Sequence, residues 1–458
     1  MRQRVGPGFA AFVFVLLICL SGGHSAGAGL RGGCAKVSIT PPIGIPLIGS
    51  YGKPSESILD DLYVRAMVLD DGHTMVAIVS ADLLYTPLDE ICRPVRRMVE
   101  DQTGIPQGNI LVCATHTHSG PEVFTRSKIR KDQEVPASSL DQAYMQTLVG
   151  RMAECVGAAR ADMRPVKIGA AVGLLPEIVF NRRPRNPQGT AVNTFTLPPR
   201  AAATRTVRTG DDGLTTVSFA LGGEKSDLTW GPVDPELRVL RVADANDRTV
   251  GSLVNFACHP VCVYPHLPTA ISADYPGDVT ELAEQVEGGV CLFVLGAAGD
   301  IVPYQRGLEG HRRMGRAVGG EAIRRLAFVA TNDDVTLAAV RRNVEFPTKP
   351  SGSGDAAEPN PPETISTEMQ ILRLGDIYML GLPGEVLVEI GLEIKKRAAV
   401  EHLFIVSLAN DAIGYVCHAQ AYDEKGYEPG EATRLAKGAG EIMVTEALSL
   451  IEQARRGE

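Results

Sequence analysis

The sequence predicts an α/β fold in which one large domain is built around a mixed sheet. Short apolar runs rich in β-branched residues alternate with helical stretches along most of the chain. The run at 75–84 is followed by a helical stretch at 91–104 and a second apolar run at 109–120. The alternation returns at 250–300 and again at 377–399. Several of the apolar runs end in polar residues, and ligands of open α/β sheets gather at such strand ends.

The N-terminus has the pattern of a secretory signal peptide. Arg2 and Arg4 precede an apolar run at 9–20, and an A-x-A cleavage site ends at Ala28. The expected boundaries are therefore a signal peptide at 1–28 and one catalytic domain at 29–458. We expect an exported, periplasmic or extracellular protein, with an uncleaved anchor as the alternative.

Two irregular stretches at 182–213 and 346–364 are expected to be long loops of that one domain, because strand patterns continue after each. The 54 acidic and 45 basic residues give a net charge of −9, which argues against a nucleic-acid partner. Eight of the nine cysteines follow the signal segment. Disulfides are open to them in an oxidising compartment, but several lie in apolar runs typical of buried thiols.

The most informative cluster is THTHSGP at 115–121, which directly follows the apolar run NILVCA. If the strand continues, alternation places His116 and His118 on one face. Neutral imidazole nitrogens bind zinc, and the neighbouring hydroxyls can orient the rings. The pattern favours a metal site over two unrelated polar residues at a turn.

Other strand ends add further polar groups. His259 lies in NFACHP, where the following proline stops the strand. Glu385 and Tyr415 offer a carboxylate and a phenol, and either could instead cap a helix. Asp300 could orient a ligand histidine or cap a turn.

The order of these segments resembles the neutral and alkaline, non-lysosomal ceramidase family. The matching segments span nearly all of 29–458: ITPP (39–42), THTHSGP (115–121), NR (181–182), NFACHP (255–260), GAAGD (296–300), PGE (383–385) and GY (414–415). The resemblance implies a mixed α/β catalytic domain that hydrolyses the amide of N-acylsphingosine with a single zinc ion. The implied zinc ligands are His116, His259, Glu385 and Tyr415. His118 is then a group beside the metal, and Arg182 matches an arginine that faces the reacting carbonyl.

The chain departs from the family pattern in two respects. Where fuller members carry GDVSPN, residues 299–304 read GDIVPY, so Val302 replaces a serine and excludes a serine nucleophile there. We also expect no C-terminal immunoglobulin-like domain, because the chain ends soon after Tyr415. Substrate entry and membrane contact could therefore differ from those of the family.

The expected reaction is attack of zinc-activated water on the N-acyl amide of a ceramide-like lipid, which releases fatty acid and sphingoid base. Such a lipid could be presented to the enzyme at a membrane surface. Zinc lowers the pKa of bound water to about 7. Tyr415, Arg182 or His118 would stabilise the oxyanion, and His118 or Asp300 would protonate the leaving amine. The alternatives are a zinc hydrolase of an ester, carbohydrate or small polar amide, and a non-catalytic exported binding protein.

Overall fold

The computed structural model describes residues 1, 29–50, 52–122, 139–222, 227–350 and 364–457, so the expected signal peptide falls almost wholly outside the described residues.

The larger of the two main sheets has eight strands. The strands are β1 (Arg31–Ser38), β5 (Tyr63–Asp70), β6 (Met75–Ala81), β7 (Ile110–Ala114), β8 (Arg164–Leu174), β13 (Glu236–Asp244), β14 (Thr249–Phe256) and β16 (Val290–Leu295). Their order is β16-β14-β13-β8-β1-β5-β6-β7. The pairs β6/β7 and β14/β16 are parallel, and the other neighbours are antiparallel.

The second sheet has four strands in the order β18-β19-β20-β22. Its members are β18 (Leu337–Pro347), β19 (Thr364–Leu374), β20 (Ile377–Gly381) and β22 (His402–Val406). Only β20/β22 is a parallel pair among them. Because Pro347 pairs with Thr364, the predicted loop at 346–364 connects two adjacent strands of this sheet. Residues 351–363 of that loop lie outside the described residues.

The two sheets pack face to face because their strands are apolar on both faces. Met67 and Ile78 of the larger sheet share one buried cluster with Leu372 and Met379 of the smaller sheet. Alternate residues of the same strands point the opposite way and pack under helices. The predicted mixed-sheet α/β class is confirmed, and it takes the form of two stacked sheets between helical layers.

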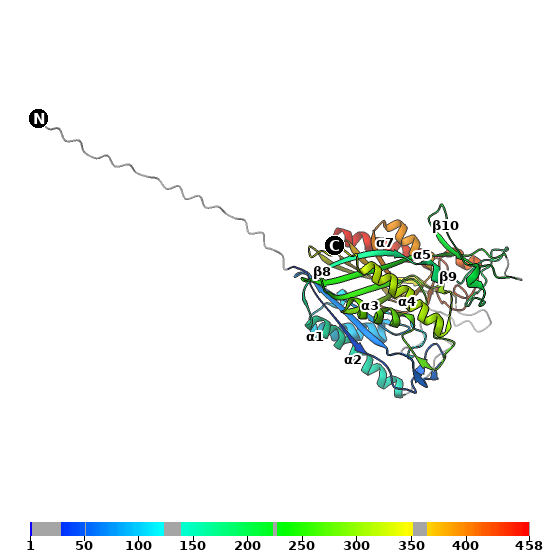
Figure 1. The fold of residues 1–458 in the computed structure, drawn as a ribbon, viewed down its shortest axis with the longest axis horizontal. Coiled ribbons are helices and arrows are strands. Elements are labelled where there is room, and N and C mark those ends of the chain that lie inside the picture. The colour runs from blue at the N-terminus through cyan, green and yellow to red at the C-terminus, as the bar shows by residue number, and fades with distance from the viewer. Residues whose placement is uncertain (2–28, 51, 123–138, 223–226, 351–363, 458) are drawn as a thin grey trace.

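Helices cover the outer faces of both sheets (Figure 1). The larger sheet carries α1 (Arg93–Thr103), α2 (Ser139–Ala161), α3 (Tyr275–Glu287) and α4 (Gly307–Leu326). The smaller sheet carries α5 (Val388–Ala398) and α7 (Ala439–Arg456), and the short α6 (Ala419–Glu424) contacts α7. The described residues form one large domain, with no immunoglobulin-like domain among them.

Short ladders shape the loops around the two sheets. They are β2 (Pro46–Leu47) with β3 (Lys53–Pro54), β4 (Ser57–Ile58) with β15 (Ala270–Ile271), β9 (Val179–Asn181) with β17 (Ile301–Pro303), β21 (Glu385–Val386) with β23 (Tyr415–Val416), and the three-stranded β10 (Thr206–Thr209), β11 (Thr215–Ser218) and β12 (Pro232–Val233). The stretch 182–213, expected to be a loop, therefore contains strand β10. All four residues of β10, which read TVRT, are exposed, so the strand has no alternation of buried apolar and exposed polar residues that would have predicted its pairing with β11.

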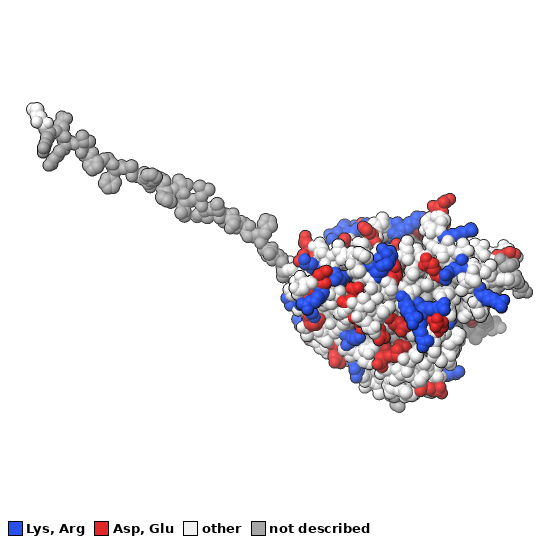
Figure 2. Space-filling model, in the orientation of Figure 1, with Lys and Arg blue, Asp and Glu red and all other residues white. Residues whose placement is uncertain are grey.

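The surface carries charges of both signs, and the cysteines are buried thiols. On the face shown in Figure 2, acidic and basic side chains are interspersed. All eight cysteines of the described part are buried and free of disulfides. No helix within the described ranges is long and apolar enough to cross a bilayer.

A buried ion pair joins the two sheets and gives a test of the packing. Arg96 of α1 donates to the Ile110 carbonyl and pairs with Glu368 of β19, and Arg96 is fully buried. Replacing Arg96 by Met should lower the free energy of unfolding by about 3 kcal/mol, because Glu368 loses this buried partner.

The matched control is Arg93→Met on the same helix, whose ion pair with Asp89 is exposed. Its effect should stay within about 0.5 kcal/mol. Urea unfolding followed by circular dichroism measures both variants. Equal shifts for the two would contradict the assignment of Arg96 as a link between the sheets.

Candidate metal centre

The ends of the parallel strands meet at one point between the two sheets. His116 follows β7, His259 follows β14 and Glu385 follows β20, so each of the three parallel pairs within the two main sheets contributes one residue. The ring centroids of His116 lie 4.8 Å from His259 and 4.9 Å from His118. His116 and His259 are therefore neighbours in the fold although 143 residues separate them in the chain.

His116 is held by its backbone and by its ring. Strand β7 ends at Ala114, and His116 has a left-handed φ of 73°. The expectation that strand alternation aligns His116 with His118 is therefore wrong, and the loop conformation brings the two rings together. The Nδ1 of His116 lies 3.0 Å from the Leu84 carbonyl, a contact that fits donation from Nδ1–H and leaves Nε2 as the free donor atom for a metal.

His259 is oriented in the same way. Its Nδ1 is hydrogen-bonded to the Ala298 carbonyl, so Nε2 points to Glu385. Burial lowers the pKa of His259 to about 4, with a further contribution from the Arg182 charge. Burial and the neighbouring rings also lower the pKa of His118 well below its ordinary value. Both rings are thus neutral at physiological pH, which is the form that binds metals.

Glu385 lies between the two rings. Its Oε2 is 3.3 Å from Nε2 of His116 and 3.2 Å from Nε2 of His259, and Tyr85 donates to Oε1 at 2.8 Å. Burial alone would raise the pKa of this carboxyl group, but His116 and His259 hold it well below its usual range. Glu385 is therefore ionised although only 4% exposed.

Tyr415 is the direct neighbour of Glu385, because these two residues pair across the β21/β23 ladder. The turn before Glu385 requires Gly384, whose φ is 99° and whose Cβ position would lie 2.5 Å from the Gly414 carbonyl oxygen. Burial, with Glu385 nearby, raises the pKa of Tyr415 well above its usual value. Without a metal ion, Tyr415 keeps its phenol proton.

Arg182 faces the phenol of Tyr415 from the end of β9. Its Nη2 donates to the Tyr415 hydroxyl at 3.1 Å, and its Nε donates to Glu428 at 2.8 Å. The other oxygen of Glu428 accepts from Arg183 at 2.7 Å. Glu428 is fully buried, so it fixes Arg182 and balances its charge.

The hydrogen-bond partners of Asp300 are not residues of the histidine cluster. Its carboxylate accepts from the Asn181 side chain at 2.8 Å and from the Val388 backbone N–H at 2.9 Å. Burial raises its pKa to about 7. These contacts tie β9 to the start of α5, which is a positioning role. Val302 is buried in β17 and pairs with Phe180, so no nucleophile stands there.

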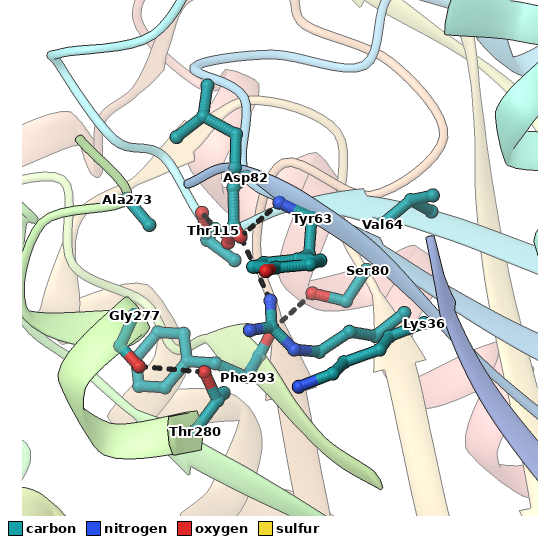
Figure 3. A network of polar contacts seen from close by, with 12 residues as sticks. Lys36, Tyr63, Val64, Ser80, Asp82, Thr115, Ala273, Gly277, Thr280 and Phe293 are labelled. Carbon is teal, nitrogen blue, oxygen red and sulfur yellow. Dashed lines mark hydrogen bonds and ion pairs between the residues drawn. The ribbon is translucent and has the colours of Figure 1, made fainter. Parts of the chain in front are cut away.

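A polar network fixes the segment that carries His116 (Figure 3). The buried Asp82 follows β6 and accepts from the Tyr63 backbone at 2.8 Å and from Arg65 at 2.9 Å. Thr115 donates to the other Asp82 oxygen at 3.3 Å. Asp82 therefore connects the ends of β6 and β7 just before the histidines begin.

The donor atoms fit a metal ion. One nitrogen each from His116, His118 and His259 lies within 4.8 Å of the other two. The Nε2 atoms of His116 and His118 are buried without a hydrogen-bond partner. Imidazole nitrogens and carboxylate oxygens are donors typical of zinc. Two sets of metal ligands are compatible with this geometry, and both contain His116 and His259. One set adds His118, and the other adds Glu385 and Tyr415.

Sequence reasoning missed three supporting residues: Tyr85, Asp82 and Glu428. Asp82 ends an apolar strand, which is the same signal that identified the histidines, so it could have been found. Tyr85 and Glu428 act on partners 300 and 246 residues away along the chain. No local pattern marks such contacts.

Metal binding distinguishes the two donor sets. His116→Ala should abolish tight zinc binding, because both sets use His116. If Glu385 is a ligand, Glu385→Gln should raise the Kd for zinc by about a hundredfold or more, beyond the usual effect of an outer-sphere partner. His118→Ala should raise it less. The exposed His266 provides the control variant His266→Ala, and isothermal titration with zinc is the measurement.

Unchanged zinc affinity in His116→Ala would contradict the site itself. A larger loss in His118→Ala than in Glu385→Gln would favour the three-histidine set. Circular dichroism of each variant without metal separates ligand loss from unfolding.

Comparisons with known proteins concern the sequence and the fold of the chain. No family model matches the sequence. A neutral ceramidase from Mycobacterium tuberculosis is 24% identical over 459 aligned positions, which cover 83% of this chain and 70% of that protein. The crystal structure of neutral ceramidase from Pseudomonas aeruginosa has a TM-score of 0.73 at 18% identity and covers 93% of this chain and 75% of its own. A ceramidase complexed with C2 gives a TM-score of 0.70 with the same identity and coverage. The chain is therefore similar in sequence to a neutral ceramidase and shares the fold of the solved ceramidase structures.

Proposed function

We propose that the chain is a zinc-dependent hydrolase of the N-acyl amide bond in ceramide-like lipids. The observation that carries this proposal is the meeting of neutral imidazoles and an ionised carboxylate at one buried point. The relationship to neutral ceramidases supports the choice of bond and of lipid. His116, His259, Glu385 and Tyr415 would hold the zinc ion.

Bound zinc would supply a Lewis acid and an activated water near neutral pH. The chain's own residues position the substrate around it. Arg182 donates to the Tyr415 hydroxyl, and this pair would face the amide oxygen as negative charge develops on it. Donors that are already oriented stabilise this charge without reorganising during the reaction.

His118 is the better of the two groups considered as proton donor to the leaving amine. The Asp300 carboxylate is occupied by Asn181 and Val388, whereas the His118 Nε2 is buried without a hydrogen-bond partner. A depressed pKa makes protonated His118 a strong acid. His118 would take a proton at Nε2 during water activation and pass it to the amine nitrogen.

We further propose that the protein is exported. The N-terminal charge and hydrophobicity pattern at 1–28 supports this location, and the interspersed surface charge in Figure 2 does not favour electrostatic adhesion to anionic lipid. Lipid substrate would then be met outside the cytoplasm, at a membrane surface or in a dispersed form.

The proposed activity has a direct test. The purified protein should release sphingosine from N-acylsphingosine, because the site would then contain its metal and both oxyanion donors. A chelator should remove the activity, and added zinc should restore it. Full activity after complete metal removal would contradict the zinc mechanism, and stoichiometric zinc without release would point to another bond.

Glu428 provides a test of the role given to Arg182. Glu428→Gln should lower kcat by about tenfold with little change in KM, because Arg182 loses its fixed position while the substrate pocket stays intact. Arg182→Ala should lower kcat by about a hundredfold or more. Glu393→Gln, at an exposed carboxylate on α5, is the control and should match the wild type.

Zinc content and thermal midpoint are measured on each variant, and kinetics are run well below the midpoint. An unchanged kcat in Glu428→Gln would contradict the positioning role. A loss of kcat that only follows a loss of bound zinc or of folded protein would contradict it as well.

A further inference from the structure

Arg306 is a second arginine beside the histidine cluster, and it lies outside the motifs that define the site. It follows strand β17 and directly precedes helix α4. The next residue, Gly307, donates its backbone N–H to the Cys262 carbonyl at 2.7 Å. The backbone N–H of His118 contacts the carbonyl of Pro260 on the same loop. Arg306 and His118 therefore both adjoin the loop that begins at His259.

The surroundings of Arg306 contrast with those of Arg182. Arg182 is buried with two charged or polar partners, Glu428 and Tyr415. Arg306 is only partly exposed, its Nε is buried, and its guanidinium has no hydrogen bond or ion pair anywhere in the described ranges. The positive charge of Arg306 contributes to the lowered pKa of His118, and the backbone contacts above place both residues beside the same loop.

A partly buried guanidinium without a counter-ion is unfavourable for folding. Burial and the like charge of Arg182 lower the pKa of Arg306 to about 10, which still leaves it positively charged at neutral pH. The carboxylate of Asp274 is in range of its charge but is engaged with the backbone of Val263 and Tyr275. A guanidinium that lacks a counter-ion beside a reaction site is suited to bind an anionic group of a ligand.

We propose that Arg306 binds an acidic group, a phosphate or a carboxylate, on the amine portion of the substrate. The inference rests on the proposed amide hydrolysis, in which His118 faces the leaving amine. Because Arg306 and His118 adjoin the same loop, Arg306 would lie on the same side of the scissile bond. The acyl chain is hydrocarbon and offers no anion, so the acidic group belongs to the amine portion. The preferred substrate is then an acidic N-acyl lipid rather than neutral ceramide.

The experiment compares three substrates with one acyl chain: N-acylsphingosine, its 1-phosphate ester, and an N-acyl amino acid. The wild type should have a higher kcat/KM for at least one of the acidic substrates than for N-acylsphingosine, and which one shows whether phosphate or carboxylate is bound. Arg306→Gln should reduce that preference at least tenfold, because a charge-assisted bidentate contact is lost. Arg306→Lys should retain part of the preference.

The matched control is Arg313→Gln on the exposed face of the same helix α4, which should leave the preference unchanged. No preference for either acidic substrate in the wild type, or an equal preference in Arg306→Gln, would overturn the inference.

A binding measurement separates this inference from the proposed function. Decyl phosphate and decanoate are titrated against wild type and Arg306→Gln by calorimetry, with both proteins in the same metal state and with decanol as the neutral probe. The wild type should bind one of the anions at least tenfold more tightly than the variant does. This difference would support the anion site even if no amide were hydrolysed, and equal affinities for both anions would overturn it.

Discussion

The buried carboxylate of Glu385 is the constraint around which the centre is organised. An ionised carboxylate removed from water costs several kcal/mol unless it is paired and hydrogen-bonded. Here Tyr85 donates to one oxygen, while His116 and His259 approach the other. The two imidazoles are in turn fixed by backbone carbonyls. Residues that hold the rings and the carboxylate in place are therefore needed for the fold as well as for metal binding.

The stacked-sheet architecture is what allows these groups to meet. His116 and His259 come from the larger sheet, whereas Glu385 and Tyr415 come from segments that follow strands of the smaller one. The β21/β23 ladder sets Glu385 opposite Tyr415. A shift of this register by one residue would turn one of the two side chains away from the site. The arrangement of these four side chains therefore depends on the packing between the two sheets and on one short ladder.

The sequence predicted which residues lie at the candidate site better than it predicted how they are arranged there. Polar residues at the ends of apolar strands are a local signal, and this signal together with motif order identified His116, His259 and Glu385. The loop conformation at His116 is set by contacts with the Leu83 and Leu84 carbonyls, so strand alternation could not predict it. Strand β10 and the sheet stacking depend on long-range pairing in the same way. Metal identity, ligand set and export stay predictions.

The two arginines beside the centre differ in what they can contribute to a reaction. The charge of Arg182 is already balanced by Glu428, so it gains little by attracting an anion in the ground state. Under the proposed function, Arg182 would stabilise charge that develops on the substrate, and stabilisation of that kind raises kcat. Arg306 has no such balance, and its charge favours an anion that is present before and after the bond breaks. An interaction that stabilises the bound substrate and the transition state equally lowers KM and favours the substrate that makes it. Glu428 pairs with Arg182 and Arg183 but not with Arg306. Under the two proposals, Arg182 would therefore act in catalysis and Arg306 in recognition.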